Sequence, residues 1–309
     1  MKKLLSKIIS LLLVVSAMFA FTACAEVEDG SKITRVKFVV EFYDENGQAT
    51  SYDVYAKLYE NFAPNTIAHV KGLIEKGYYT NTCISNVTNG YAQFGDYTFG
   101  EGLSLVAKDQ GSAINGEFYK NGVTGNKLNA AEGALVLLHD VKGAEKYDTG
   151  RATIAISYSA SSFDAEGYCI FGKLVADDGN ADASDEMGKL SSLGKMQKIT
   201  ERISDDDGRK LFYCITSEEE VTNGEEGEEE EKVAISGKYI TYLSYEDGMK
   251  YVVGSRFYKD AADVANDNEA VILSAEQAND LIEKMSENAT DFLRVPVLKV
   301  IIKSAEIVK

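Results

Sequence analysis

The stretch Gly77–Asp96 carries the side chains with which this protein could act on another molecule. It reads Gly-Tyr-Tyr-Thr-Asn-Thr-Cys-Ile-Ser-Asn-Val-Thr-Asn-Gly-Tyr-Ala-Gln-Phe-Gly-Asp. Between its glycines the pattern is that of an extended chain, with Ile84, Val87 and Tyr91 as the apolar positions and Asn86 and Gln93 among the polar ones. A side-chain amide donates hydrogen bonds without carrying a charge. The chemistry available here is therefore hydrogen bonding from neutral groups.

Other catalytic chemistries have no support in the sequence. It has no Gly-x-Ser-x-Gly, no Walker loop and no His-Glu-x-x-His. With His69 and His139 as its only histidines and no Cys/His metal spacing, the sequence gives little support to a catalytic triad or a zinc site. The acidic run Glu218–Glu231 lacks the Asp-x-Asp-x-Asp-Gly spacing of a calcium loop. We expect no cofactor and no metal.

Composition narrows the class of protein further. The chain has 309 residues, of which 45% are hydrophobic, so it can bury a core as one large domain or two ordinary ones. Its net charge of -17 argues against nucleic acid as a partner, because binding a phosphate backbone requires lysine and arginine. An acidic surface favours solubility and cationic partners.

The first 24 residues have the layout of a secretory signal. Lys2, Lys3 and Lys7 are followed by the apolar run Ile8–Phe21 and by small residues before Cys24. This is similar to the signals that lipoprotein signal peptidase cleaves, with Cys24 as the lipidated first residue. An uncleaved anchor or an ordinary signal peptide is the alternative, although the apolar run is short for a membrane-spanning helix. We expect an extracytoplasmic protein, lipid-anchored to a bacterial cell membrane.

Removal of the leader leaves three cysteines, Cys83, Cys169 and Cys214. They allow one disulfide with a spare thiol, or three buried thiols. Cys83 and Cys169 lie in apolar strand-like runs, which favours plain core residues.

The elements that must position Gly77–Asp96 begin after a short tether, Ala25–Lys32. Ile33–Tyr43 alternates between apolar and polar residues, as a half-buried strand does. An Asn-Gly pair then predicts a tight turn into a second strand, Tyr52–Tyr59. Pro64 starts a helix that Gly77 ends. Further on, Ser274 and Gln277 have the spacing of a capping box at the start of another helix.

Several segments occur in the order and spacing of one known family. The family's hallmark begins Gly-Tyr-Tyr, continues Phe-His-Arg-Val-Ile-x-Gly-Phe and closes Gln-Gly-Gly-Asp, and Gly77–Asp96 keeps this frame with one residue fewer. Gly116-Glu117-Phe118 and Phe171-Gly172-Lys173 also match, and Arg294–Ile307 is similar to the family's last strand. Over about two thirds of the mature chain, the sequence resembles the cyclophilin-type peptidyl-prolyl isomerases.

This resemblance implies a mainly β fold: a cyclophilin-like closed antiparallel eight-stranded barrel capped by two helices, with a β-rich insertion. We expect a signal peptide over 1–24, a tether over 25–32 and the cyclophilin-like domain over 33–203 and 271–309. The insertion would occupy 204–270, with an acidic loop over 218–231, because like charges at that density repel one another. We expect a monomer.

The resemblance also implies a mechanism, since members of the family use the arginine of Phe-His-Arg to donate hydrogen bonds toward the prolyl amide. Asn86 stands at that position, Gln93 stands for a supporting glutamine, and Arg151 could reach the groove from an adjacent strand. We therefore assign Asn86, Gln93 and Arg151 as the catalytic residues. Because the loss of one preorganised donor typically costs about 10²–10³ in rate, we expect weakened activity.

The substrate-binding residues are assigned by the same resemblance. Tyr91 replaces a pocket phenylalanine, Phe163 replaces a pocket leucine, and Tyr168 falls where many bacterial members have tyrosine. Ala155 replaces the deep phenylalanine, which blunts the proline pocket. The full predicted set is Tyr91, Ala92, Leu138, His139, Thr153, Ala155, Phe163 and Tyr168.

Two functions follow. The first is a peptidyl-prolyl cis-trans isomerase that acts on proline-containing exported polypeptides, with activity weakened by Asn86. The second is a catalytically inactive cyclophilin-like module that binds peptides or proteins on the cell envelope, with the acidic insertion as the partner surface. In both, the lipid on Cys24 attaches the chain to the membrane.

Overall fold

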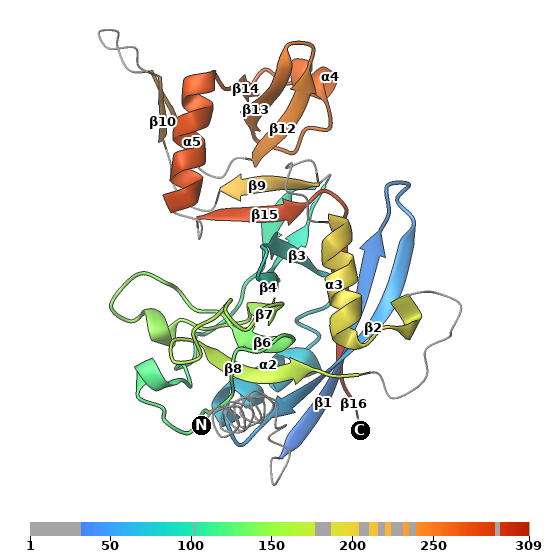
Figure 1. Ribbon diagram of the computed structural model, residues 1–309, viewed down its shortest axis with the longest axis vertical. Coiled ribbons are helices and arrows are strands. Elements are labelled where there is room, and N and C mark those ends of the chain that lie inside the picture. Colours follow the sequence, from blue (N-terminus) through green and yellow to red (C-terminus); the bar gives the residue numbers. More distant parts are fainter. Residues whose placement is uncertain are drawn as a thin grey trace, which may run out of the picture. The chain divides into compact units, whose positions relative to one another are not determined.

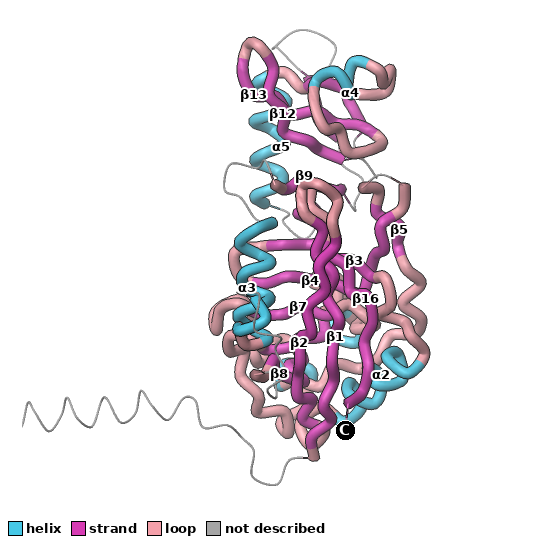
Figure 2. Tube along the Cα trace, turned by 90° about the vertical axis from the view of Figure 1, so that its right-hand side faces the viewer, coloured by secondary structure: helices cyan, strands magenta, loops and turns pink. Residues whose placement is uncertain are grey.

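The computed structural model describes residues 32–101, 103–176, 187–203, 210–215, 220–223, 231–234, 239–287 and 291–308. The predicted signal peptide, Cys24, most of the tether and most of the acidic segment lie outside these residues. Figures 1 and 2 show the elements. The strands are β1 Ile33–Tyr43, β2 Ala49–Tyr59, β3 Thr82–Val87, β4 Tyr91–Phe99, β5 Leu105–Ala107, β6 Ala134–Leu137, β7 Ile154–Ser157, β8 Cys169–Leu174, β9 Leu211–Ile215, β10 Glu220–Asn223, β11 Glu231–Ala234, β12 Tyr239–Tyr245, β13 Gly248–Gly254, β14 Val271–Ile272, β15 Phe292–Pro296 and β16 Val300–Val308. The α-helices are α2 Pro64–Glu75, α3 Ser192–Ile203, α4 Ala261–Ala265 and α5 Ala275–Glu287.

Eight antiparallel strands form a closed barrel. Their order is β3-β16-β1-β2-β8-β6-β7-β4, and pairing of β3 with β4 closes the cylinder. β5 extends the sheet as one extra strand beside β4. Closure leaves the eight strands without a free edge, and the predicted barrel is confirmed.

The alternation of apolar and polar residues along β1 directs its apolar side chains into the barrel core. Val36, Phe38, Val40 and Phe42 point inward from β1 and are buried. The predicted turn joins β1 to β2, and Gly47 takes a φ of 74° there. The carboxylate of Asp44 also accepts hydrogen bonds from two backbone N–H groups of the turn.

Two helices pack against the barrel, as predicted. α3 is fastened to β2, because the hydroxyl of Ser192 accepts from Tyr55 N at 2.8 Å and Lys195 Nζ donates to Asp53 O at 2.9 Å. α2 starts at Pro64 but has no side-chain cap of its own. The Glu117 carboxylate supplies one from the following loop, accepting from Asn65 N at 3.1 Å and Thr66 N at 2.7 Å. A negative group at a helix N-terminus also meets the positive end of the helix dipole.

The insertion folds into a second sheet of order β14-β13-β12-β9-β15. This sheet includes β14 and β15, so it extends beyond the predicted segment 204–270 to Pro296, and the barrel resumes with β16 at Val300. Within the predicted acidic loop, 220–223 form β10, which pairs with β11. The predicted capping box opens α5, since Gln277 N donates to Ser274 Oγ and Ser274 N donates to Gln277 Oε1.

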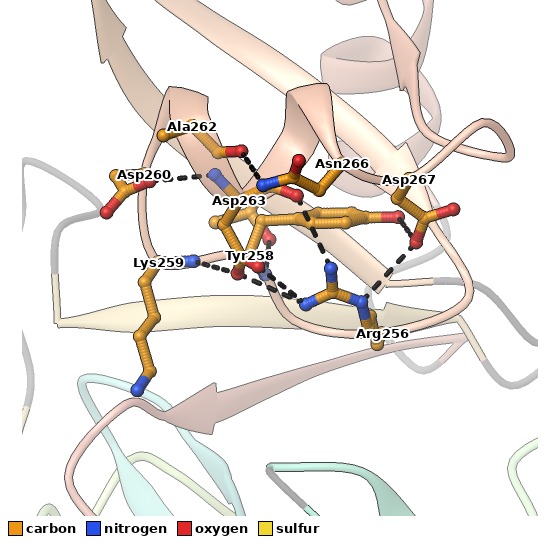
Figure 3. A network of polar contacts seen from close by, with 9 residues as sticks. Arg256, Tyr258, Lys259, Asp260, Ala262, Asp263, Asn266 and Asp267 are labelled. Atoms are coloured by element: carbon orange, nitrogen blue, oxygen red, sulfur yellow. Dashed lines mark hydrogen bonds and ion pairs between the residues drawn. The ribbon is translucent and has the colours of Figure 1, made fainter.

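Figure 3 shows how the second sheet fastens its own connection between β13 and α4. Arg256 Nη1 contacts both carboxylate oxygens of Asp263, at 3.0 and 3.1 Å. Its Nε lies 3.4 Å from the carboxylate of Asp267, which also accepts from the Tyr258 hydroxyl at 3.0 Å. The guanidinium packs over the Tyr258 ring at 4.8 Å. This network joins residues of the second sheet to one another.

Cys83, Cys169 and Cys214 are free and buried, in agreement with core residues. Burial raises the pKa of the Cys169 thiol to about 12 and of the Cys214 thiol to about 11, so both are neutral at physiological pH. Within the described residues, no helix is both long enough and apolar enough to cross a membrane.

The cap on α2 can be tested by Glu117→Gln. Glutamine has one acceptor oxygen in place of two and no charge, so we expect a loss of about 1–2 kcal/mol in the free energy of unfolding, measured in urea. Glu75→Gln, the same change at the exposed C-terminal end of α2, should stay within about 0.5 kcal/mol of the wild type. Equal effects of the two changes would contradict the capping role.

Candidate active groove on the barrel

Three neighbouring strands form the floor of a groove on the outside of the barrel. Asn86 on β3 lies directly opposite Gln93 on β4, and Gln93 lies opposite Ala155 on β7. Gly95 takes a φ of 103°, and a Cβ there would lie 2.5 Å from Ala152 O. The glycine of the hallmark motif is thus required where β4 passes close to the backbone that precedes β7.

A buried carboxylate fixes the orientation of Gln93. Asp96 accepts from Ser85 Oγ at 2.6 Å and from Gln93 Nε2 at 2.5 Å. Burial raises the pKa of the Asp96 carboxyl from its ordinary value, and these two hydrogen bonds oppose that shift. Because the amide nitrogen of Gln93 donates to Asp96, its amide oxygen faces Asn86.

Asn86 is held from the opposite side by the second sheet. Its Oδ1 accepts from the backbone N–H of Arg294 on β15 at 3.0 Å. Its Nδ2 faces Gln93 Oε1 at 3.5 Å and the Tyr91 hydroxyl at 3.4 Å, both long for hydrogen bonds. The amide oxygen is therefore committed to β15, whereas the amide nitrogen is engaged only weakly.

Aromatic rings form the apolar half of the groove. The ring centroids of Tyr91 and Phe163 lie 5.0 Å apart, and those of Phe163 and Tyr168 lie 5.2 Å apart. His139 stacks on Tyr168 at 4.8 Å, and its two nitrogens contact the carbonyl oxygens of Asp140 and Gly167. Burial raises the pKa of the Tyr91 and Tyr168 phenols, so both remain neutral. Such a ring cluster is suited to an apolar side chain.

The polar half of the groove contains a cation. Arg151 lines it with its guanidinium held by Thr149 O, which accepts from Nη1 at 3.3 Å. Beside it, Gln110 Oε1 accepts from Ala152 N at 3.2 Å and from Thr153 Oγ1 at 2.8 Å. His69, which lies on α2, contacts the backbone oxygen of Arg151 at 2.6 Å and takes no part in the lining.

A cavity of about 600 Å³ lies in this groove. It gathers Asn86, Gln93 and Arg151 and most of the residues predicted to bind substrate: Tyr91, Leu138, His139, Thr153, Phe163 and Tyr168. Two predicted residues do not line it. Ala92 lies in the interior of the barrel at 1% exposure, because neighbours along a strand point to opposite faces. Ala155 is fully buried beneath the groove, packed in the cluster that contains Phe163.

Sequence reasoning missed the part of the groove that the second sheet supplies. Asp291 and Leu293 line the cavity, and Asp291 forms an ion pair with Lys142 at 3.0 Å. Gln110 was missed as well. Asp291 precedes β15 and Leu293 lies in it, within a segment that resembles the family only from Arg294 onward, so no motif marks either residue. Among the described residues, no group of three His, Cys, Asp or Glu side chains is arranged to hold a metal.

Comparison with known proteins agrees with this geometry. The family model described as cyclophilin type peptidyl-prolyl cis-trans isomerase matches residues 46–203, about half of the chain. The chain therefore belongs to the cyclophilin-type peptidyl-prolyl cis-trans isomerases, a family that acts on proline-containing polypeptides.

A crystal structure of a cyclophilin-type peptidyl-prolyl cis-trans isomerase from Cryptosporidium parvum is 21% identical, covers 57% of this chain and 88% of its own, and superposes with a TM-score of 0.37. A second structure of that protein, in the presence of the dipeptide Ala-Pro, is 19% identical, covers 56% and 88%, and has a TM-score of 0.36. No curated protein matches the sequence.

The contact between Asn86 and β15 can be tested by Asn86→Ala. The change leaves the N–H of Arg294 without its acceptor, so we expect a loss of about 1–3 kcal/mol in the free energy of unfolding, measured by chemical denaturation. Asn266→Ala removes an exposed asparagine that bonds only within α4, and it should change the free energy by less than about 0.5 kcal/mol. If the Asn86→Ala chain is as stable as the Asn266→Ala chain, the contact between Asn86 and β15 does not contribute to the free energy of unfolding.

Proposed function

We propose that the groove binds proline-containing segments of exported polypeptides and isomerises X–Pro bonds slowly, with Asn86 as a neutral donor in place of the family's arginine. The observation that carries the proposal is the position of the Asn86 amide beside the ring cluster of Tyr91, Phe163 and Tyr168. The rings offer a site for the proline ring, and the amide lies next to it.

The reaction itself asks little of the protein in chemical terms. Rotation about the X–Pro amide must disrupt its resonance, against a barrier of about 18–20 kcal/mol. A catalyst needs neither nucleophile nor cofactor, only a site that binds the twisted amide more tightly than the planar one. An apolar pocket for the proline ring and one hydrogen-bond donor toward the prolyl amide can form such a site.

The donor at Asn86 is weaker than the family's. Its Nδ2 has only long contacts with Gln93 and Tyr91, so it can turn its N–H groups to a substrate. It lacks charge and the guanidinium fork, and its oxygen is engaged by Arg294 N. Arg151, which also lines the groove, supplies a positive charge there. These features support turnover at a rate well below that of a member with the arginine.

A second candidate function is binding without catalysis. It is favoured by the engagement of Asn86 with β15, because a residue that fastens two parts of the chain together is less free to follow a reacting amide. Ala155, buried beneath the groove, also favours binding without catalysis, because it stands where the family has a deep phenylalanine. In this function the groove, together with the second sheet, would hold an extended peptide on the cell envelope.

An isomerase assay on the chain from residue 25 onward separates the two functions. We expect a measurable rate above the uncatalysed one, about 10²–10³-fold below that of a cyclophilin with the arginine. Tyr168→Ala should lower kcat/KM about tenfold by opening the ring cluster, whereas Tyr119→Ala, at a residue 59% exposed and outside the groove, should leave it unchanged. An uncatalysed rate at saturating protein, with proline-dependent peptide binding intact, would select the binding function.

The location of the protein is part of the proposal. Supported by the lysine-rich start, the short apolar run and Cys24, we propose an extracytoplasmic chain held on a bacterial membrane by a lipid on Cys24. A chain held on the outer side of the membrane would meet exported polypeptides while they fold.

The anchor can be tested with Cys24→Ala in a bacterial host. We expect the wild-type chain to incorporate radiolabelled palmitate and to sediment with membranes, and the Cys24→Ala chain to do neither. Cys214→Ala, at a buried thiol, serves as the control and should keep the label. Labelling that survives the loss of Cys24 would place the lipid elsewhere.

A further inference from the structure

Tyr91 extends from the apolar half of the groove to its polar floor. Its ring packs against Phe163, with the ring centroids 5.0 Å apart, and its hydroxyl oxygen lies 3.4 Å from Asn86 Nδ2. Of the two phenols in the ring cluster, those of Tyr91 and Tyr168, that of Tyr91 contacts the Asn86 amide. One side chain thus joins the place suited to a proline ring to the amide at position 86.

The hydroxyl of Tyr91 has a hydrogen to donate. A hydroxyl can accept two hydrogen bonds and donate one, and the contact with Asn86 uses only its oxygen, because Nδ2 is the donor there. Among the residues that the structure describes, no group accepts the O–H hydrogen. Burial raises the pKa of the Tyr91 phenol, so the hydroxyl keeps that hydrogen at physiological pH. The O–H rotates about its bond to the ring and can turn toward a bound polypeptide.

The backbone around Tyr91 holds this hydroxyl in place. The hydroxyl of Thr88 accepts from Tyr91 N at 3.0 Å, and Tyr91 O accepts from Thr88 N at 2.9 Å. The preceding residue, Gly90, passes so close to Ser162 that a Cβ at Gly90 would lie 2.5 Å from Ser162 Oγ. Ser162 Oγ in turn donates to Gly90 O at 2.7 Å. The donor is therefore preorganised, and preorganised donors are the ones that accelerate a reaction.

We propose that Tyr91 is a catalytic residue, whose O–H donates a hydrogen bond to the prolyl nitrogen as the X–Pro amide twists; this rests on the proposed function of the groove. In the planar amide the nitrogen lone pair is delocalised into the carbonyl, whereas in the twisted amide it is localised and accepts a hydrogen bond. The hydroxyl therefore binds the twisted amide more tightly than the planar one, and no proton is transferred. The N–H of Asn86 that points at the phenol oxygen polarises the O–H and strengthens it as a donor.

The hydroxyl is what distinguishes this side chain from the family's. The resemblance places a phenylalanine at position 91 and an arginine at position 86, and this chain has a tyrosine and an asparagine whose side chains are in contact. A phenylalanine has no donor, so a ring of that kind can only form a wall of the pocket. In this chain two neutral donors, the O–H of Tyr91 and the N–H groups of Asn86, lie together where the family has one cation.

Tyr91→Phe removes the hydroxyl, keeps the ring and introduces the residue type that the family has at this position, so it separates donation from binding without threatening the fold. Exchange NMR of the peptide Ala-Ala-Pro-Ala with the chain from residue 25 onward gives both the isomerisation rate at saturation, kcat, and the Kd. We expect kcat to fall about five- to tenfold, as for the loss of one neutral hydrogen bond, and the Kd to stay within about twofold. Tyr119→Phe makes the same change at a residue that is 59% exposed and outside the groove, and it should alter neither quantity.

The outcomes distinguish this inference from the proposed function. If the wild-type chain catalyses the exchange and Tyr91→Phe leaves kcat unchanged, the inference is wrong and the isomerase function stands. A Kd that rises while kcat stays the same also overturns the inference, because the hydroxyl then binds the planar and the twisted amide equally. So does an equal loss of kcat in Tyr119→Phe. A wild-type rate no faster than in free solution overturns the proposed isomerase function, and the catalytic role of Tyr91 with it.

Discussion

A partly buried hydrogen bond beside the groove joins the second sheet to the barrel: the backbone N–H of Arg294 donates to the side chain of Asn86. The direction of this hydrogen bond sets the orientation of the Asn86 amide and, through it, of the Gln93 amide. Since a backbone N–H can only donate, Asn86 must offer its oxygen, and its nitrogen then faces Gln93. Asp96 imposes the same order from the other end. The backbone N–H of Arg294 at one end and the Asp96 carboxylate at the other thus fix the orientation of the two side-chain amides between them, Asn86 and Gln93.

The amide at position 86 thus has a structural role. A guanidinium carries donors only, so it could not accept the hydrogen bond from β15. Asn86 instead accepts this bond from β15, the strand that contains Leu293 and follows Asp291, two residues that line the groove.

The barrel was predictable from the sequence because its strands carry local signals: alternation in β1, the Asn-Gly turn and the glycines around β4. Most of the groove was predictable too, since its residues sit in motifs with a fixed register. Ala92 lies between Tyr91 and Gln93 and points into the core, whereas both neighbours line the groove. Asp291 and Leu293 could not be found, because their place depends on a contact about 200 residues apart in the chain, for which neither periodicity nor composition gives a sign.

β15 is the outermost strand of its sheet, and such strands are open to pairing with other molecules. Here the barrel covers it: Asn86 occupies the N–H of Arg294, and Pro296, further along the strand, has no N–H to offer. At these two positions the strand has no free N–H with which to pair with another chain.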